Sequence, residues 1–306
     1  HKPAHVFVLT RIRSATRRQL ARVGRHVISP LIFRLHRPLD GAEMPVSVHM
    51  LVSSETWDAG ILAAISFENF SGRRWPLFIH EDGSVTQAQR RTIEKILPGV
   101  RFVPRPEAEK VMETRLAKHP KSLSNRSRHN LFLKFFDFPA YAPYDRFVVL
   151  DSDVIFFKRP GEILSWADGG KEECWFNEDT KEKYCIPRPR IEQQLGIKIW
   201  ERVNTGICLI SKSAISLELG ERLLVAFETS AHHPQFFEQT LYALMASALN
   251  KGGMLPPTYN ISWGYLRAPR SICRHYVGAF KHDLLYIEGA PSLLALLAIS
   301  RIVQRN

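Results

Sequence analysis

Two aspartates interrupt the most apolar stretch of the chain. Segment 147–157 reads FVVLDSDVIFF, so Asp151 and Asp153 stand two residues apart among β-branched and aromatic side chains. Alternate side chains of a strand share a face, so a strand that continues to Asp153 would present both carboxylates together. Such a pair needs a cation, and its hard oxygen ligands select Mg²⁺ or Mn²⁺, which keep positions open for phosphate oxygens. The alternative is an Asp-Ser-Asp turn at a strand end.

The elements around this stretch alternate in type. Extended patterns are expected at 46–52, 75–80, 101–104, 147–157 and 207–211, and helical patterns at 57–70, 86–97, 108–118, 130–138, 214–227 and 236–249. This alternation predicts an α/β domain with a mostly parallel sheet, in which the two carboxylates lie at the carboxyl end of a central strand. The long polar region 168–196 is expected to be an irregular binding loop or lid.

Composition limits the class of protein. A chain of 306 residues with 45% hydrophobic content can bury a large core, which excludes a disordered or fibrous chain. The four cysteines are too few and too irregularly spaced for a disulfide framework or a zinc site. Only Cys174 and Cys185, which bracket a polar loop, could pair, and Cys208 lies in an apolar run. We expect reduced thiols and a cytoplasmic enzyme.

Positive charge is concentrated at the start of the chain. The formal net charge is +12, and residues 1–40 hold nine Lys or Arg against one acidic residue, a contribution of +8. Segment 11–37 resembles a basic amphipathic helix that ends at Pro30, and it could either lie on an anionic membrane or pack on the domain. A solvated, partly disordered tail is the alternative. Because the arm lacks interleaved aromatics and a recognised binding motif, no specific nucleic-acid partner is expected.

Three regions are therefore expected: a basic arm at 1–45, a catalytic domain at 46–285 and an apolar tail at 286–306. No uninterrupted apolar run reaches the eighteen or so residues of a transmembrane helix. The first residue is His rather than Met, as expected if an N-terminal segment has been removed. The tail either packs on the core or joins the arm on a membrane, which would place the enzyme peripherally at the inner membrane face.

Further motifs follow the two aspartates in a fixed order. They are Asn204-Thr205-Gly206 before a strand, Glu238-Gln239 opening a helix, the stretch 255–260, and His275-Tyr276-x-Gly278-x-x-Lys281. This order, over residues 46–285, resembles the nucleotide-sugar glycosyltransferases of GT-A fold, particularly the retaining, galactosyltransferase- and glycogenin-like family (family 8-like). The resemblance implies a GT-A, Rossmann-like fold with a mixed, mostly parallel sheet flanked by helices. It also implies sugar transfer from a UDP-sugar donor to a glycan or lipid-linked acceptor, with retention.

The resemblance implies that one set of residues binds the diphosphate that departs when the sugar is transferred. Asp151, Asp153 and His275 would hold Mn²⁺ or Mg²⁺, and the imidazole suits Mn²⁺ better. Lys281 would contact the diphosphate, with Gly278 allowing the loop to wrap closely around it. A metal and a lysine can together stabilise the charge that grows on the departing diphosphate.

Other residues are assigned to the sugar and the nucleotide. Asn204, Thr205 and Gly206 would line the sugar pocket, and Gly206 would allow close backbone approach. Gln239 would stand near the anomeric carbon, and Glu238, where the family usually has Asp, would touch the donor sugar or the acceptor. The catalytic set is therefore Glu238, Gln239 and Asn204.

The remaining substrate-binding residues are Lys134, Ser152, Ser53 and Ser54. Lys134 stands where the family often has an Arg that touches the donor, and the alternative is a solvent-facing lysine. Ser53 and Ser54 follow the first strand, in the nucleotide-base region. Two other functions stay open: an inverting enzyme with Glu238 as general base, and a non-catalytic protein whose basic arm binds a membrane or nucleic acid.

Overall fold

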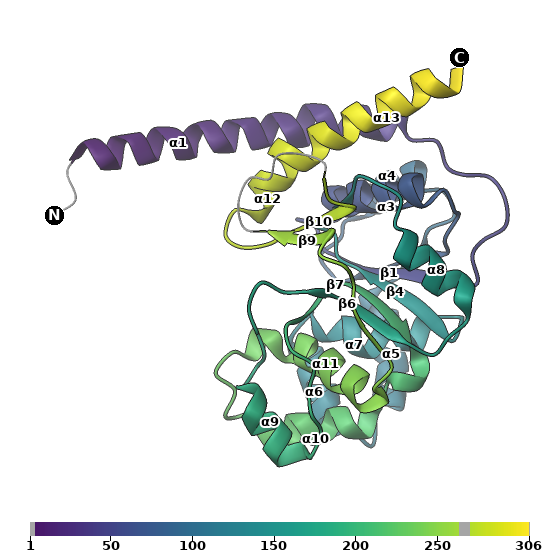
Figure 1. Ribbon diagram of the computed structural model, residues 1–306, viewed down its shortest axis with the longest axis vertical. Helices are drawn as coiled ribbons and strands as arrows, with labels where there is room; N and C mark the ends of the chain where they lie inside the picture. The colour runs from purple at the N-terminus through teal and green to yellow at the C-terminus, as the bar shows by residue number, and fades with distance from the viewer. Residues whose placement is uncertain (1–3, 263–269, 306) are drawn as a thin grey trace.

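A computed structural model describes residues 4–262 and 270–305 and shows an α/β domain built on two sheets (Figure 1). The main sheet has seven strands in the order β3-β2-β1-β4-β7-β6-β8. The strands are β1 (Ser47–Val52), β2 (Leu77–Glu81), β3 (Arg101–Val103), β4 (Arg146–Leu150), β6 (Cys174–Glu178), β7 (Val203–Ser211) and β8 (Gly252–Met254). Only β7 runs antiparallel to its neighbours β4 and β6, so the sheet is mixed and mostly parallel, as predicted.

Helices cover both faces of this sheet (Figure 1). One face carries α3 (Trp57–Ser71), α4 (Gln87–Ile96) and α8 (Gly161–Gly169). The other carries α5 (Arg105–Arg115), α6 (Pro120–Arg128), α7 (Phe132–Tyr141), α9 (Arg188–Leu195), α10 (Leu217–Phe227) and α11 (Phe237–Leu249), with the short 3₁₀ turns η2 (Lys212–Ala214) and η3 (Pro234–Phe236). The apolar side chains of the central strands are buried between these layers.

A second sheet of three strands, in the order β5-β10-β9, lies beside the carboxyl edge of the first. It contains β5 (Val154–Phe156), β9 (Tyr259–Ser262) and β10 (Cys273–Tyr276). The expected continuous strand through Asp153 is wrong, because β4 ends at Leu150 and β5 pairs with β10 instead. A tight turn, in which the Val154 N–H donates to the Asp151 carbonyl at 3.2 Å, joins the two strands.

Several other boundaries differ from those predicted. Region 168–196 is not an irregular loop, because it contains β6 and α9. Both elements bury part of their residues, but the many polar residues among them made the sequence resemble a loop. The polar stretch before α7 forms the helix α6. The motif at 204–206 lies inside β7 rather than before it. Cys174 and Cys185, the only two cysteines that could have paired, do not: all four cysteines are buried and free.

The N-terminal arm is one continuous helical segment. It consists of α1 (Ala4–Val23), the π-helical turn η1 (Gly24–Ile28) and α2 (Ser29–Leu35), and it passes Pro30, where the prediction had ended the helix. The wider π-turn explains this continuity, because the Ser29 N–H and hydroxyl both donate to the Gly24 carbonyl just before the proline, which has no N–H to donate.

The arm packs against the C-terminal segment, which consists of α12 (Lys281–Leu284), the π-helical turn η4 (Leu285–Gly289) and α13 (Ala290–Arg305). A Cβ added to Gly24 would lie 2.0 Å from the Tyr286 carbonyl oxygen, so the two backbones touch here. Arg17 pairs with Asp283 at 2.7 Å. The predicted boundary between the domain and the apolar tail, at residues 285 and 286, falls inside the turn η4 of this segment.

Stretch 281–300 of the C-terminal segment is long and apolar enough to cross a membrane, by length and composition alone. Charged residues near its start interrupt the apolar run, which is why the sequence showed no run of eighteen. Buried side chains attach it to the domain along its length: Leu284, Leu285, Tyr286, Ala290, Leu293 and Leu297. Arg274 of β10 also forms an ion pair with Glu288. We therefore describe the segment as a helix of the domain.

We predict that Gly24→Ala lowers the free energy of unfolding by about 1–3 kcal/mol, the usual cost of overpacking, because the added methyl group forces the arm away from Tyr286. Urea unfolding followed by circular dichroism measures this change. Gly161→Ala is the control, since a Cβ there meets no atom within 4 Å. Equal stability of the two variants would show that the arm does not need this contact.

Candidate active site

Asp151, Asp153 and His275 come together at the carboxyl edge of the main sheet. Each offers one ligand atom, and these atoms all lie within 4.8 Å of one another. His275 Nε2 lies 3.1 Å from Asp153 Oδ1 and 3.9 Å from Asp151 Oδ2. The turn after β4 supplies the carboxylates, and β10 supplies the imidazole because His275 pairs with Val154 in the second sheet. The junction of the two sheets thus assembles the cluster.

Hydrogen bonds fix the orientation of the His275 ring. Asn204 Nδ2 donates to Asp179 at 3.1 Å, and Asn204 Oδ1 accepts from the Gly206 N–H at 2.9 Å. The same Oδ1 lies 3.0 Å from His275 Nδ1, which must therefore carry the proton and donate. This tautomer directs Nε2 toward the two carboxylates, the arrangement that a metal-binding histidine needs.

Gly206 creates the space for this ring. A Cβ built on Gly206 would lie only 2.2 Å from His275 Nδ1. No residue with a side chain can therefore occupy position 206 while His275 keeps its place. The sequence predicted close approach at Gly206, but toward a sugar, whereas the group that approaches it in the structure is the histidine ring.

The donor set fits a divalent cation. Asp153 is 5% exposed, and within the described residues its Oδ1 has no hydrogen-bond partner. Burial acts to raise the pKa of Asp153, but His275, when its ring is protonated, and the Lys281 ammonium lower it, and the net shift is downward. The carboxylate therefore stays ionised, with one oxygen available as a ligand beside an oriented imidazole nitrogen.

Two lysines neutralise the carboxylates from opposite sides. Lys281 Nζ lies 2.7 Å from Asp153 Oδ2. Lys134 Nζ lies 2.9 Å from Asp151 and 3.3 Å from Glu238, and it donates to the Thr205 carbonyl at 3.0 Å. At 2% exposure Lys134 is no solvent-facing lysine, so that alternative is wrong. Burial acts to lower the pKa of Lys134, but Asp151 and Glu238 raise it above its ordinary value, so it remains a cation.

Glu238 and Gln239 open α11 directly beside this cluster. Thr205 Oγ1 donates to Glu238 Oε2 at 2.9 Å, while Oε1 is the oxygen that lies 3.3 Å from the Lys134 ammonium. Burial raises the pKa of Glu238, and Lys134 opposes that shift. Gln239 Nε2 donates to the Lys183 carbonyl at 2.7 Å, so its amide is held by the backbone after β6.

Four predicted residues lie outside this network of contacts. Ser53 and Ser54 form the turn after β1, where the Ser54 N–H donates to Ser84 Oγ at 2.8 Å. Ser152 lies between the carboxylates and close to α3, with its Cβ 3.8 Å from the position of a Cβ added to Gly60. Gly278 has a φ of +87°, and its carbonyl accepts from the Lys281 N–H at 3.2 Å, which turns the chain toward Asp153.

Asp179 is the site residue that the sequence did not reveal. It is 1% exposed and pairs with Lys183 at 2.9 Å while it accepts from Asn204. It lies within the region expected to be irregular, so nothing marked it as buried. Recognising β6 would have placed Asp179 at a strand end beside β7, next to Asn204.

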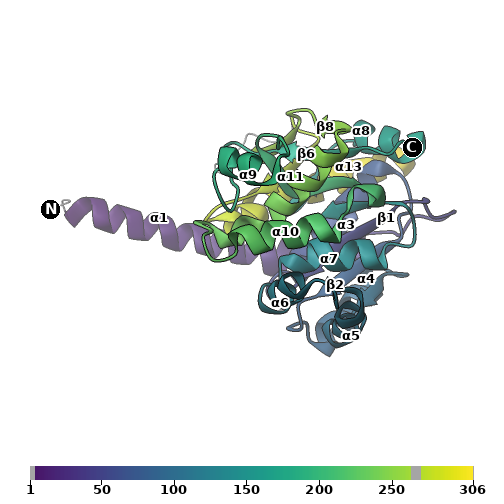
Figure 2. The ribbon, with the colours of Figure 1, turned by 90° about the horizontal axis from the view of Figure 1, so that it is seen from below.

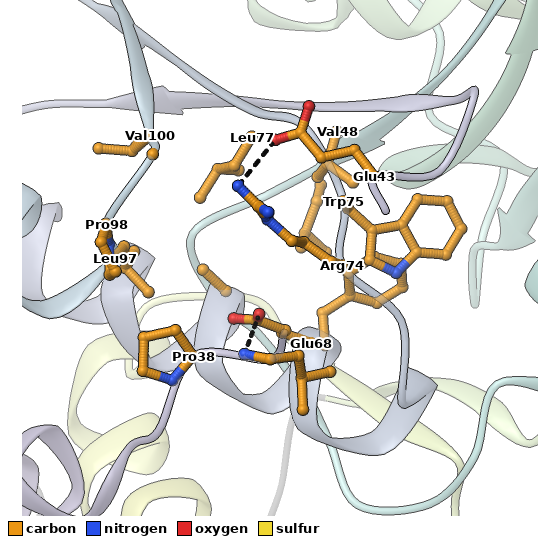
Figure 3. Close-up of a pocket in the computed structure, with 15 residues that line it drawn as sticks. Pro38, Glu43, Val48, Glu68, Arg74, Trp75, Leu77, Leu97, Pro98 and Val100 are labelled. Carbon is orange, nitrogen blue, oxygen red and sulfur yellow. Dashed lines mark hydrogen bonds and ion pairs between the residues drawn. The ribbon is translucent and has the colours of Figure 1, made fainter. Parts of the chain in front are cut away.

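A separate cavity lies on the α3 side of the sheet (Figure 3). Its volume is about 60 Å³, with an apolar lining that includes Phe67, Trp75 and Leu97 and with the Arg74–Glu43 ion pair at its edge. It is too small for a nucleotide sugar, and none of the predicted site residues lines it.

No protein-family model and no curated protein matches the chain. Solved structures do match. The galactosyltransferase LgtC in complex with donor and acceptor sugar analogues superposes with a TM-score of 0.54 at 15% identity, covering 83% of this chain and 96% of that chain. The chain has the GT-A fold. Apo mouse xyloside xylosyltransferase 1 gives a TM-score of 0.53 at 12% identity, covering 75% and 97%. The glycosyltransferase GlyE of Streptococcus pneumoniae TIGR4 gives 0.52 at 11% identity, covering 87% and 64%.

These identities establish the GT-A fold alone. In this fold the carboxylate cluster occupies the carboxyl edge of the sheet, where open α/β sheets bind their ligands.

We predict that Gly206→Ala weakens Mn²⁺ binding by about 10–100-fold, the usual cost of disturbing a residue that supports a metal ligand, because the methyl group displaces His275. Calorimetric titration with Mn²⁺ measures the affinity. Gly220→Ala, whose Cβ would meet its neighbours at 3.5 Å or more, is the control. Unchanged affinity in Gly206→Ala would exclude His275 as a ligand.

Lys134→Met should lower the free energy of unfolding by about 3–5 kcal/mol in EDTA, because it leaves Asp151 and Glu238 without their shared cation. Urea unfolding tests this. Adding Glu238→Gln to the variant should recover part of the loss, since one buried charge is then removed. If Lys134→Met alone were as stable as the parent, Lys134 would not be the cation that stabilises Asp151 and Glu238.

Proposed function

We propose that the chain is a metal-dependent glycosyltransferase that transfers a sugar from a UDP-sugar to a glycan or lipid-linked acceptor, with retention of configuration. One observation carries the proposal: two carboxylates, an oriented imidazole, the buried Lys134 and the half-exposed Lys281 converge at the carboxyl edge of a GT-A sheet. Such a cluster supplies the cation chemistry that a departing nucleoside diphosphate requires.

The leaving group is handled by residues of the acidic turn and of the 275–281 segment. Asp151, Asp153 and His275 would hold a divalent cation, with Mn²⁺ favoured by the nitrogen ligand, and this cation when bound would neutralise diphosphate charge. The Lys281 side chain is 40% exposed, so its ammonium can turn from Asp153 to an incoming phosphate oxygen.

The donor's other parts would lie along the same edge. Strands β1 and β4 are parallel neighbours. Ser53 and Ser54, which follow β1, therefore lie at the same carboxyl edge of the sheet as Asp151, which follows β4. This placement supports a nucleotide base near the two serines and a diphosphate at the acidic turn. Two parts of the proposal come from the order of motifs in the sequence: that the nucleotide is a uridine nucleotide, and that residues 204–206 line the sugar pocket.

Retention is supported by the surroundings of Glu238. A general base of an inverting enzyme must take a proton from an acceptor that arrives from solvent. Glu238 is 4% exposed, accepts from Thr205 and lies 3.3 Å from the Lys134 ammonium. A carboxylate held in this way is suited to stabilising positive charge that develops on the donor sugar rather than to receiving that proton.

With Mn²⁺ present, the protein should bind UDP in calorimetry and hydrolyse at least one common UDP-sugar. Asp153→Asn should abolish both, because it removes charge from the ligand set, and EDTA should have the same effect on the parent. Asp168→Asn, a change at an exposed carboxylate, is the matched control. Absence of both UDP binding and hydrolysis across the donor panel would defeat the proposal. Where transfer is found, NMR of the product anomer tests retention.

A further inference from the structure

The arm helix exposes a row of aliphatic side chains. Leu20, Val23, Val27 and Leu31 are 51%, 43%, 54% and 41% exposed. Their spacing of three, four and four residues places them along one side of the continuous α1–α2 helix. They are four of the nine large hydrophobic residues exposed in the described part of the chain, and all four lie within twelve residues. We call them the arm stripe.

Packing within the fold does not account for the arm stripe. A neighbouring side of the same helix is already covered, since Ala21, Gly24 and Ile32 are buried against the C-terminal segment and the domain. The apolar part of the helix surface is therefore wider than the part that the domain and the C-terminal segment cover. A contiguous apolar row of this kind marks an interaction surface.

The charges around the arm stripe are of one sign. Arg18, Arg22 and Arg34 are exposed, and residues 1–39 contain no Asp or Glu. Two other arginines serve a different purpose: Arg17 and Arg25 pair with Asp283 and Asp58, which attach the arm to the domain. The exposed arginines therefore remain available for an acidic partner.

The arm also projects from the molecule. Figures 1 and 2 show the N-terminal part of α1 extending well beyond the domain, and the arm stripe continues from it along the part of the arm that packs beside the C-terminal segment. Phe280, 49% exposed, adds an aromatic ring at the base of this helix, and the Arg17 guanidinium lies 3.8 Å from its centroid. Aliphatic, aromatic and arginine side chains together are the composition of interfacial helices.

We propose that this side of α1–α2 is a docking surface for an anionic lipid bilayer. The arm stripe would enter the headgroup region with Arg34 on the same side of the helix, and the exposed Arg18 and Arg22 farther around the helix would add to the attraction of the arm for an anionic surface. A second copy of the chain is a poorer partner, because stripe-to-stripe packing would bring the two sets of arginines together. A nucleic acid would leave the aliphatic row without a role. The proposal does not depend on the proposed enzymatic function.

The test is co-sedimentation of the full chain with vesicles of phosphatidylcholine alone or mixed with phosphatidylglycerol. We expect binding only to the mixed vesicles. Leu20→Glu/Val27→Glu should weaken it at least tenfold, because each side chain loses its burial, and Arg18→Gln/Arg22→Gln/Arg34→Gln about a hundredfold. Val225→Glu, at a valine 65% exposed on α10, is the control and should bind as the parent does.

Two results would overturn the proposal: no binding to mixed vesicles, or undiminished binding by Leu20→Glu/Val27→Glu. Light scattering that shows a dimer, dissolved by the same variant, would identify a second copy as the occupant instead. Circular dichroism verifies that each variant is folded. UDP-sugar hydrolysis without vesicles should be unchanged in the stripe variant, so that failure of the lipid proposal can be told apart from failure of the enzymatic one.

Discussion

The pairing of largely buried carboxylates with neighbouring cations is the interaction on which this structure depends. Lys134 links Asp151 to Glu238, and Asp153 lies between His275 and Lys281. A buried charge without a partner would cost several kcal/mol. The fold must therefore bring α7, the acidic turn, α11 and the 275–281 segment to one edge of the sheet. The arrangement that satisfies these charges also places two carboxylates and an imidazole where they could hold a divalent cation.

The fold could be predicted because its signals are local. Apolar strands and alternating helices appear directly in the sequence, and Asp151 and Asp153 were placed correctly at the carboxyl end of a central strand. The predictions failed where burial depends on distant partners. Strand β6 is buried because β7 and β8 flank it, although its polar neighbours suggested a loop, and Asp179 was missed with it. The burial of Lys134 likewise follows from carboxylates elsewhere in the chain.

Two glycines also show that a sequence does not reveal contacts with distant parts of the chain. Gly206 was expected to leave room for a sugar, and Gly24 attracted no prediction. In the structure each meets a group from a distant part of the chain, the His275 ring and the Tyr286 carbonyl. A sequence shows where a side chain is missing, but the partner that fills the space is defined only by tertiary packing. The motif order therefore predicted which residues form the site better than it predicted what each one touches.

The segment around residue 280 connects the arm to the candidate site. Phe280 lies beneath Arg17 of α1, Lys281 reaches Asp153, and Asp283 pairs with Arg17. Tyr286, one turn later, touches Gly24. A displacement of the arm must therefore move residues that neighbour Lys281 directly in sequence. Because packed helices shift as units rather than deform, the arm and the segment that carries Lys281 are expected to shift together.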